Sequence, residues 1–576
     1  MLQKFLLNHR EVAMDKIIRI DMTELKATTE KSPVDFQLLG GRGLSARILN
    51  TEVPALAHPL SHENRLVVAP GILAGTMAPS FGRISFGAKS PLTKTIKESN
   101  AGGTAAQKLD RLGIKAIIVQ GKPKDNQSHI ILIDARGAQI IPAPEISGKM
   151  NYELVTSLQD RYGKEIGVIS IGPAGEARLA ASTIAVTDQD GRPSRHAGRG
   201  GLGAVMGSKG IKAIVINAEG TKAIGPLNKA GFTDTIKDLV EILKQDKGAQ
   251  SFSQFGTPGG IKFLSQLGSM PSRNYHGGPV EGIENIYGEA ILNVNKSRGG
   301  RMHGCMPGCV IQCSIVFHGD DGQHLTSALE YETLAMLGTN VAITNLDAVA
   351  RMDRLCDELG VDTIEVGSAI AQLMEAGLIQ FGDEEKVMEV LRGVGQGAPL
   401  GKIVGQGTAF TAQYLGLDRV PVSKGQAIPA HDPRACKTVG VTYCVSPMGA
   451  DHTAGIDYRD PLSKEGQVQR SRDVQILMAT IDSVGYCLLA MPTKGKLIYD
   501  ILTKLINARY GTELKAEEVM NIGINTIKEE VAFNHSAGWT GVQNRLPDFL
   551  RTEKLPPHNE VFDIPQDEID AVFQEV

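Results

Sequence analysis

The stretch Arg195-His-Ala-Gly-Arg-Gly-Gly-Leu-Gly-Ala-Val-Met-Gly-Ser-Lys209 decides how the first part of the chain folds. Gly198 to Gly203 fits the G-x-G-x-x-G pattern, but a dinucleotide-binding loop follows a buried strand, and the polar segment 188–195 stands here instead. We therefore reject a Rossmann domain. The glycine-rich loop carries Arg192, Arg195 and Arg199, which suits phosphate binding by main-chain N–H groups and guanidinium groups. A solvated arginine loop is the alternative.

The pattern of apolar residues changes on either side of residue 220. Up to about Ala218, β-branched runs alternate with glycine, and strands are predicted at 65–69, 115–121, 130–134, 166–171 and 212–217. Beyond Leu227 the spacing is helical, with helices predicted at 228–245, 346–359 and 362–378. We expect an α+β protein with a β-rich domain (1–222) and two mainly helical domains (223–425 and 426–576), joined by a connector at 420–433.

Composition excludes several classes of partner. The 576 residues include 60 basic and 64 acidic side chains, for a net charge of −4, which lacks the basic footprint of a nucleic-acid-binding protein. No window approaches the roughly 18 apolar residues of a membrane span. We expect a cytoplasmic protein. Its 65 glycines indicate many turns or close approaches of the main chain to a ligand.

Three of the seven cysteines are bunched as Cys305-Met-Pro-Gly-Cys309-Val-Ile-Gln-Cys313. Neighbouring thiolates repel one another unless a cation or cluster neutralises them, and three close cysteines with a distant fourth commonly hold a [4Fe–4S] cluster. Structural zinc is the alternative. The other lone cysteines, Cys356, Cys436 and Cys444, have no partner at ligand spacing and are interpreted as small buried hydrophobes.

A six-residue pattern of the form D-x-x-G occurs twice, in Asp357-Glu-Leu-Gly-Val-Asp362 and in Asp482-Ser-Val-Gly-Tyr-Cys487. Asp357 is predicted in the last turn of a helix that Gly360 ends, where a carboxylate is unfavourable by ~0.3–1 kcal/mol. A ligand rich in N–H groups would account for it. Taken alone, so loose a repeat is common by chance.

Two further segments carry polar residues that could act in catalysis. The S-x-x-E spacing of Ser327 and Glu330 predicts a helix capping box, which leaves Glu332 as either an exposed residue or a carboxylate directed into a site. His452 lies among the small residues of 449–455, which would let a large group approach. A lone surface histidine is the alternative.

Together these segments resemble the aldehyde:ferredoxin oxidoreductase family, whose members hold tungsten or molybdenum between two pterin dithiolenes beside a [4Fe–4S] cluster. The resemblance extends over nearly the whole chain. Its most specific parts are 40–44 (Gly-Gly-Arg-Gly-Leu), 90–93 (Ser-Pro-Leu-Thr), 98–103 (Glu-Ser-Asn-Ala-Gly-Gly), 195–209, the cysteine triplet, 330–332 (Glu-Tyr-Glu) and the two D-x-x-G motifs.

The resemblance implies a role for particular residues. In the β domain, the pterin phosphates and dithiolene edges would contact Arg83, Asn100, Gly102, Arg195, His196, Gly198 and Arg199. A Mg²⁺ ion would be held partly by the backbone carbonyls of Asn100 and His196. One pterin would be bound by Asp357, Val361 and Asp362, and the other by Asp482, Tyr486 and Leu488. Cys487 would be the fourth cluster ligand after Cys305, Cys309 and Cys313.

The activity that the resemblance implies is oxidation of an aldehyde to a carboxylic acid, with electrons passing to a ferredoxin or a similar subunit. Glu332 is expected to be the general base and His452 to hydrogen-bond the substrate oxygen, and these two roles could be exchanged. One alternative is the catalytic subunit of a reductive complex, as in tungsten-dependent benzoyl-coenzyme A reductase. Another is a non-catalytic, zinc-stabilised scaffold. The aldehyde, the choice of metal, the direction and the oligomeric state are left open.

The sequence departs from the family pattern in three places. The first gap of the cysteine triplet is typically one residue shorter in the family, and basic residues usually replace Met448 and Ala454. No E-x-x-H motif is visible where some relatives bind a further metal between subunits. A dimer bridged by that metal is therefore not expected.

Overall fold

The computed structural model describes residues 15–125, 127–492 and 497–573. Up to residue 218 the chain forms two six-stranded sheets, which confirms the predicted β-rich start. The first sheet contains β1 (Lys16–Asp21), β2 (Lys26–Lys31), β3 (Leu66–Pro70), β4 (Ile84–Lys89), β5 (Ile96–Ala101) and β6 (Ile114–Gln120). The second contains β7 (His129–Asp134), β8 (Gly137–Pro142), β9 (Gly167–Ser170), β10 (Ile184–Val186), β11 (Arg195–Ala197) and β12 (Ile211–Ile216).

The second sheet repeats the topology of the first. Their strand orders are β2-β1-β6-β3-β4-β5 and β8-β7-β12-β9-β10-β11, so each strand of the second sheet has a counterpart six places earlier. In each sheet the first and last strands in sequence pair in parallel, and the other neighbouring pairs are antiparallel. The β domain therefore consists of two equivalent halves.

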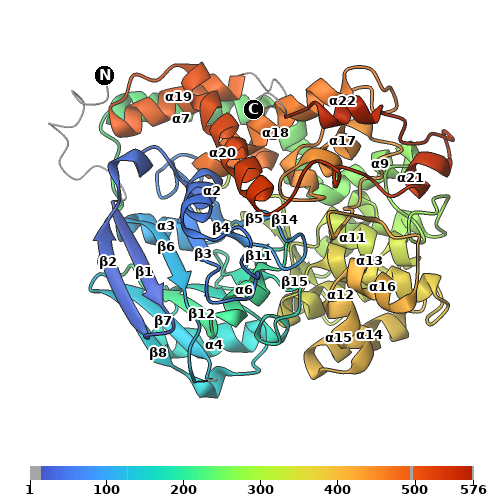
Figure 1. Cartoon of the computed structure of the whole chain (residues 1–576), viewed down its shortest axis with the longest axis horizontal. Coiled ribbons are helices and arrows are strands. Elements are labelled where there is room, and N and C mark those ends of the chain that lie inside the picture. The colour runs from blue at the N-terminus through green and yellow to red at the C-terminus, as the bar shows by residue number, and fades with distance from the viewer. Residues whose placement is uncertain (1–14, 126, 493–496, 574–576) are drawn as a thin grey trace.

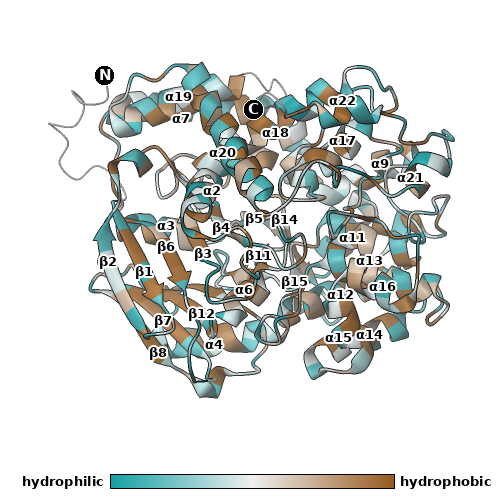
Figure 2. Ribbon diagram, viewed as in Figure 1, coloured by the Kyte–Doolittle hydropathy of each residue, from teal (hydrophilic) through white to brown (hydrophobic). Residues whose placement is uncertain are grey.

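Hydrophobic packing joins the two halves. One cluster of buried side chains draws on both sheets, for example Phe86 and Ile117 from the first and Ile133 and Ile214 from the second. The edge strand β2 is mostly polar and exposed, whereas the central β6 is buried along almost its whole length (Figure 2). Five short helices complete the domain: α2 (Gly41–Glu52), α3 (Ala105–Arg111), α4 (Asn151–Tyr162), α5 (Pro173–Glu176) and α6 (Leu202–Ser208).

The rest of the chain is mainly helical, as predicted, and covers the β domain from above and from the right in Figure 1. Its longer helices are α7 (Lys229–Gln245), α8 (Lys247–Phe255), α10 (Gly288–Ser297), α12 (Leu346–Leu359), α13 (Thr363–Glu375), α14 (Glu384–Gln396), α16 (Thr408–Leu415), α17 (Lys437–Val445), α18 (Gln467–Val484), α19 (Leu497–Tyr510) and α20 (Ala516–Ser536). Shorter elements are α9 (Ile261–Leu267), α11 (Tyr331–Met336), α15 (Pro399–Gly405), α21 (Phe549–Thr552), α22 (Gln566–Asp570), the sheet of β13 (Arg301–His303), β14 (Ser314–His318) and β15 (His324–Ser327), and the hairpin of β16 (Val422–Ser423) and β17 (Gln426–Ala427).

The helices do not pack strictly in the order of the sequence. Helix α7 packs against α19, although more than two hundred residues separate them along the chain. The segment 420–433, interpreted as a connector, forms the β16–β17 hairpin and is largely buried. The boundaries at 222 and 425 stay predictions. Within the described residues, we find no helix with the length and hydropathy needed to cross a bilayer.

Two helices of the covering layer end against the β domain at equivalent points. Helix α12 ends at Gly360 (φ +69°), as predicted, and α18 ends at Gly485 (φ +82°). The Thr183 N–H, just before β10, donates to Gly360 O (2.8 Å), and the Arg83 N–H, just before β4, donates to Gly485 O (3.2 Å). Because β4 and β10 are counterparts, the two D-x-x-G motifs meet the two halves of the β domain in the same way.

Glycine is required at these two ends for two reasons. Positive φ disfavours other residues, and the main chain of the β domain lies very close. A Cβ atom on Gly360 would lie 2.9 Å from the nitrogen of Gly172, and one on Gly485 would lie 3.0 Å from the Cα of Gly71. Gly71 directly follows β3, and Gly172 lies shortly after the end of its counterpart strand, β9.

We predict that Gly360→Ala destabilises the fold more than Gly416→Ala. Gly416 also ends a helix at positive φ (+68°), but a methyl group at that position would meet no described atom within 4 Å, whereas Gly360 abuts Gly172. Both variants carry the cost of left-handed backbone, roughly 1–2 kcal/mol, and Gly360→Ala adds overpacking of roughly 1–3 kcal/mol. Unfolding midpoints in guanidinium chloride measure the difference. Equal shifts would show that the contact with Gly172 contributes nothing.

Candidate cofactor and active site

The first aspartates of the two D-x-x-G motifs each meet a basic side chain. Asp357 Oδ1 lies 3.1 Å from Nε2 of His196. Asp482 accepts from Arg42 Nη1 (3.3 Å) and from Asn100 Nδ2 (3.1 Å). Asn100 faces Ser85 across β4–β5, and His196 faces Ala185 across β10–β11, so Asn100 and His196 are counterparts in the two halves. The structure thus brings the two motifs to matching partners.

Arg42 comes from the Gly40–Leu44 motif and is buried at the start of α2. Its Nε and Nη2 atoms both donate to the Glu530 carboxylate (2.8 Å each), while Nη1 reaches Asp482. A bidentate pair of this kind fixes the guanidinium group in one orientation. Arg42 therefore holds the second D-x-x-G carboxylate in position.

Five of the residues predicted in the β domain have defined surroundings in the structure. Arg83 Nη2 donates to the carbonyl oxygen of Asn100 (3.2 Å), the same oxygen that the resemblance assigns to magnesium. The His196 ring contacts Thr183 Oγ1 through Nδ1 (2.7 Å). A Cβ atom on Gly198 would meet nothing within 4 Å, but one on Gly102 would lie 2.9 Å from Cys305 Sγ. Gly198 borders open space, and Gly102 packs against the cysteine triplet.

The prediction for the segment before the glycine-rich loop needs one correction. The short strand β11 (Arg195–Ala197) lies directly before it, where the sequence pattern predicted only a polar loop. Pairing with β10 is antiparallel, so the rejection of a βαβ dinucleotide fold stands. Arg199 is not solvated: it bonds Asp362 (3.1 Å) and the carbonyl oxygens of Ala450 (2.9 Å) and Ala427 (2.8 Å).

Two of the predicted pterin contacts, Tyr486 and Val361, offer little side chain to a ligand. Tyr486 is fully buried, its ring packs on Phe81, and its hydroxyl donates to Ala490 O. Val361 is buried and forms a β-bridge with Ser182, and Leu488 is only partly buried. Tyr486 and Val361 could serve a ligand mainly through their main chains.

All four cysteines proposed for the cluster belong to one hydrophobic cluster of side chains. The Gly103 N–H donates to Cys305 O (3.1 Å), the Ser80 N–H donates to Gly308 O (3.2 Å), and the Cys487 N–H donates to Ser80 O (3.0 Å). Residue Ser80 thus links the triplet loop to the distant fourth cysteine. The remaining thiols, Cys356, Cys436 and Cys444, are buried elsewhere, as predicted.

The electrostatic environment favours a thiolate at Cys305. The Cys309 thiol as hydrogen-bond donor, together with the charges of Arg195 and Arg83, outweighs burial and lowers the pKa of Cys305 to about 6. Burial and the neighbouring charges of Glu330, Cys305 and Cys487 raise the pKa of Cys313. One thiolate therefore makes the next unfavourable, and a bound cation or cluster would remove that repulsion.

The capping box predicted for Ser327 and Glu330 is wrong. Ser327 is still in strand β15, paired with β14, and α11 begins only at Tyr331. The Glu330 carboxylate instead accepts from Thr257 Oγ1 (2.5 Å) and lies 3.9 Å from Arg195. Burial raises its pKa against the opposing charge of Arg195. Glu330 belongs to the site and does not cap the helix.

Glu332 and His452, the predicted catalytic pair, do lie together. Glu332 Oε1 is 3.5 Å from His452 Nε2 and 3.1 Å from Nε2 of a second histidine, His431. Glu332 Oε2 accepts from the Ala430 N–H (2.9 Å). The three side chains lie close enough together to bind a cation in principle. His431 was not predicted, because it falls in the segment interpreted as a connector.

Their protonation states follow from burial and neighbours. Burial alone would raise the pKa of Glu332, but the charges of His452 and His431, with the Ala430 N–H, lower it to about 2. Burial lowers the pKa of His452, against the attraction of Glu332. Near pH 7, Glu332 is therefore a carboxylate and His452 a neutral imidazole that can accept a proton.

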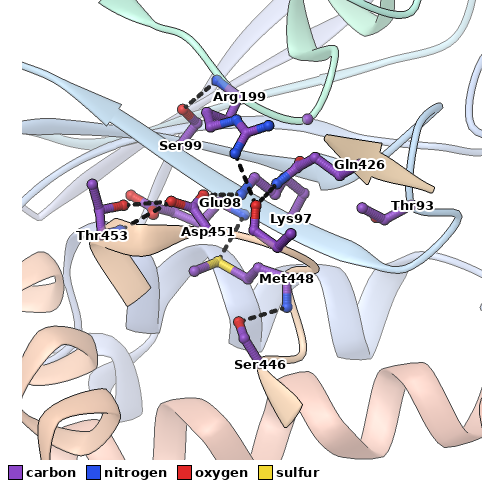
Figure 3. Close-up of polar contacts among 12 residues, drawn as sticks. Thr93, Lys97, Glu98, Ser99, Arg199, Gln426, Ser446, Met448, Asp451 and Thr453 are labelled. Carbon is purple, nitrogen blue, oxygen red and sulfur yellow. Dashed lines mark hydrogen bonds and ion pairs between the residues drawn. The ribbon is translucent and has the colours of Figure 1, made fainter. Parts of the chain in front are cut away.

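The loop that carries His452 is attached to strand β5 and to the glycine-rich loop of the β domain (Figure 3). The Lys97 ammonium of β5 pairs with Asp451, which also accepts from Thr453 Oγ1 (2.8 Å). Arg199 holds Ala450 O, and the Glu98 N–H contacts the sulfur of Met448 (3.4 Å). Lys97 and Arg199 thus bring positive charge from the β domain to a loop that lacks basic residues at 448 and 454.

The residues present fit a polar cofactor with anionic groups. The buried polar atoms that find no hydrogen-bond partner within the described ranges include, in this region, Nε and Nη2 of Arg195, Oδ2 of Asp357, Oε1 of Glu332 and Nδ1 of His452. Burial raises the pKa of Asp362 to about 6, and burial beside Asp482 raises that of Glu98 to about 8. Unpartnered buried donors and acceptors are costly. A ligand with both phosphate oxygens and ring N–H groups would satisfy them.

Comparisons with known proteins agree with this geometry. A family model described as aldehyde ferredoxin oxidoreductase, N-terminal domain, matches residues 17–218, and one for domains 2 and 3 matches residues 234–575. The tungsten-containing aldehyde ferredoxin oxidoreductase of Pyrococcus abyssi is 31% identical over 575 residues, covering 94% of this chain and 92% of that protein. The aliphatic sulfonate oxidoreductase, WOR-like subunit, of Pyrococcus furiosus is 27% identical over 483 residues, covering 76% and 74%.

Among solved structures, the active site complex BamBC of benzoyl coenzyme A reductase, in complex with 1,5 dienoyl-CoA, has the same fold. Its TM-score is 0.81 at 20% sequence identity, and the match covers 97% of this chain and 93% of that one. At this identity the likeness concerns the fold alone. The family models, by contrast, span both the β domain and the helical part. The chain therefore belongs to the aldehyde ferredoxin oxidoreductase family.

Proposed function

We propose that this protein oxidises an aldehyde to a carboxylic acid with a tungsten or molybdenum bis-pterin cofactor. The observation that carries the proposal is the docking of two D-x-x-G motifs at equivalent points of a duplicated β domain, since two similar ligands call for two similar half-sites. Bound there, the metal would supply the two-electron oxidation chemistry. The names of the curated relatives agree with this reaction.

The chain offers distinct groups to the parts of such a cofactor. Phosphates and dithiolene edges would be held by Arg83, Asn100, Gly102, Arg195, His196, Gly198 and Arg199. Each pterin ring would be held by one motif, through Asp357, Val361 and Asp362 or through Asp482, Tyr486 and Leu488. Mg²⁺ would use the carbonyl oxygens of Asn100 and His196. Asn100 O also accepts from Arg83, and a carbonyl oxygen has a second lone pair for a cation.

Electrons would leave through a [4Fe–4S] cluster held by Cys305, Cys309, Cys313 and Cys487. Supporting this role, the triplet loop lies against Gly102, next to the proposed pterin contacts. Cys309 and Cys313 are less buried than Cys305, so the cluster would approach the surface on their side. A ferredoxin or similar one-electron carrier of the cytoplasm is the partner we propose.

Proton handling falls to Glu332 and His452. His452 is neutral, and its Nδ1 atom has no partner in the described structure, so it can take a proton from water or from the hydrated aldehyde. The Glu332 carboxylate, facing Nε2, then stabilises the imidazolium ion. The geometry thus favours the exchanged roles: His452 as base and Glu332 as the charged partner.

A reductive complex is the second candidate. The fold shared with the benzoyl coenzyme A reductase complex over 97% of this chain is the observation that favours it. The same site would then accept electrons from a low-potential partner, and Glu332 and His452 would deliver protons. Activity with aldehydes and an artificial acceptor, compared with reduction of an aromatic thioester by a strong reductant, separates the two.

We predict that Cys487→Ala loses most of the iron or leaves a labile cluster. Removing one of four thiolate ligands opens the coordination of the cluster. Iron analysis and visible absorption of the purified protein measure the loss, and Cys436→Ala, a buried thiol outside the cluster, is the control. Full iron in Cys487→Ala with loss in Cys436→Ala would refute the assignment.

We predict that Asp357→Ala and Asp482→Ala each lower the pterin and heavy-metal content of the isolated protein. Each carboxylate is proposed to hold a separate pterin by its ring N–H groups. Asp353→Ala is the matched control, because Asp353 is a buried carboxylate one turn earlier on α12 that accepts from Thr326 Oγ1 (2.6 Å). Wild-type pterin content in both site variants would make the repeated motif a coincidence.

We predict that Glu332→Gln lowers aldehyde oxidation by at least ~10²-fold, within the ~10²–10⁴ range for a proton-transfer group. The amide keeps the shape but cannot stabilise an imidazolium ion. Turnover per bound metal, with an artificial one-electron acceptor, measures it without the natural partner. Glu375→Gln is the control, since Glu375 also pairs with a histidine, His276 (3.0 Å), outside the site. Similar, small losses in the two variants would remove Glu332 from the mechanism.

A further inference from the structure

We propose that His431 and Tyr458 form an exit path for protons from the Glu332–His452 pair to the surface. The inference rests on the proposed function and deepens it. Aldehyde oxidation releases protons as well as electrons: RCHO + H₂O → RCO₂⁻ + 3 H⁺ + 2 e⁻, with a one-electron carrier as oxidant. Electrons can cross a packed interior, but protons need a chain of hydrogen-bonding groups. A buried site of this kind therefore requires a route for them.

The path begins with one carboxylate oxygen between two imidazole rings. Glu332 Oε1 lies 3.5 Å from Nε2 of His452 and 3.1 Å from Nε2 of His431. The two ring centroids are 5.2 Å apart. The other carboxylate oxygen is held by the Ala430 N–H, which keeps Oε1 directed at both rings.

The path continues from His431 to Tyr458. The Nδ1 atom of His431 is hydrogen-bonded to the Tyr458 hydroxyl. His431 is buried, whereas Tyr458 is partly exposed and its ring meets the edge of Phe263, a side chain that is 54% exposed. The sequence His452, Glu332, His431, Tyr458 therefore leads from the site interior to a side chain that is partly exposed.

Each step conserves protons and breaks no other bond. The substrate proton joins Nδ1 of His452, and the proton on Nε2 passes to Glu332 Oε1. Glu332 gives it to Nε2 of His431, whose Nδ1 proton passes to the Tyr458 oxygen while that hydroxyl releases its own proton outward. An imidazole can do this because it binds a proton at one nitrogen and loses one from the other.

The groups that face His431 come from four segments of the chain, and each could affect its protonation. They are Glu332 and Tyr331 of α11, His452 of the loop after α17, Tyr443 of α17, and Tyr458. Of these groups, Tyr458 is hydrogen-bonded to Nδ1 of the ring, and the Glu332 carboxylate lies within ion-pair distance of Nε2 (3.1 Å). The variants below alter these two contacts.

Two tyrosines beside His431 provide a matched pair of variants. Tyr331 stacks on His431 (ring centroids 5.1 Å apart), but its hydroxyl donates to Ala430 O (2.5 Å). Tyr458 donates or accepts at the His431 ring itself. Tyr458→Phe therefore interrupts the path, while Tyr331→Phe removes a buried hydroxyl from the same cluster and leaves the path intact.

The first measurement is independent of turnover: exchange of the histidine C2 hydrogen for deuterium, followed by mass spectrometry across pH on the purified full chain. We expect Tyr458→Phe and Glu332→Gln each to shift the titration of His431, and Tyr331→Phe to leave it unchanged. An unchanged His431 titration in Tyr458→Phe would overturn the path. Because this readout needs no loaded cofactor, it stands even if the proposed reaction is wrong.

The second measurement is turnover per bound metal with an artificial acceptor. We expect the turnover of His431→Ala to fall by at least ~10-fold, which is less than the loss for a proton-transfer group in direct contact with substrate. The metal content of this variant should stay normal, and added imidazole should partly restore its turnover. The turnover of Tyr458→Phe should fall, and its solvent deuterium isotope effect should rise. Tyr331→Phe should change neither quantity. Wild-type turnover in His431→Ala, a loss that imidazole does not rescue, or one equivalent of zinc bound through His431 would overturn the proposal.

Discussion

The structure depends on two main-chain hydrogen bonds, from Arg83 N–H to Gly485 O and from Thr183 N–H to Gly360 O. They fix the ends of α18 and α12 to counterpart positions of a duplicated β domain. Glycine permits so close an approach, because any Cβ atom there would overlap the backbone of the other segment. Asp357, Asp482 and Cys487 lie within three residues of these contacts. The two hydrogen bonds therefore determine where both D-x-x-G motifs and Cys487 lie relative to the β domain.

A second feature is the number of charged side chains kept away from water. Arg42, Arg199 and Lys97 are buried in pairs with carboxylates, and breaking a buried pair typically costs about 3–5 kcal/mol. These pairs also join segments that are distant in sequence, such as α2 with α20 and β5 with the loop of Asp451. Arg195, Asp357 and His452, which are among the buried residues with polar atoms that lack partners in the described structure, lie in the region proposed for the cofactor. The buried pairs thus form a polar frame beside the region proposed for the cofactor.

The groups proposed for electrons and for protons lie beside different hydrophobic clusters, since Tyr331 and Tyr443, which contact His431, belong to another cluster than Cys305 and Cys487. Cys305 and Cys487 pack with α18 and α19, whereas His431 packs beside α11 and α17. Arg195 lies near both, since its charge acts on Cys305 and its side chain approaches Glu330. Under the proposed function, such an arrangement would let electrons and protons leave by separate routes.

Only the resemblance to the family singled out Cys487 as a fourth cysteine. From its own pattern, the sequence determined the order of a β-rich part before a helical part, the glycine that ends α12, and the bunching of Cys305, Cys309 and Cys313. These features follow from local spacing and residue type. It did not show that β7–β12 repeat β1–β6, because β-branched runs do not say which strands pair. It misassigned Ser327 and Glu330, since the pairing of β15 with β14 holds Ser327 in a strand. His431 meets Glu332 only through packing of distant segments. Contacts between residues far apart in the chain are decided by tertiary structure, because no local preference encodes them.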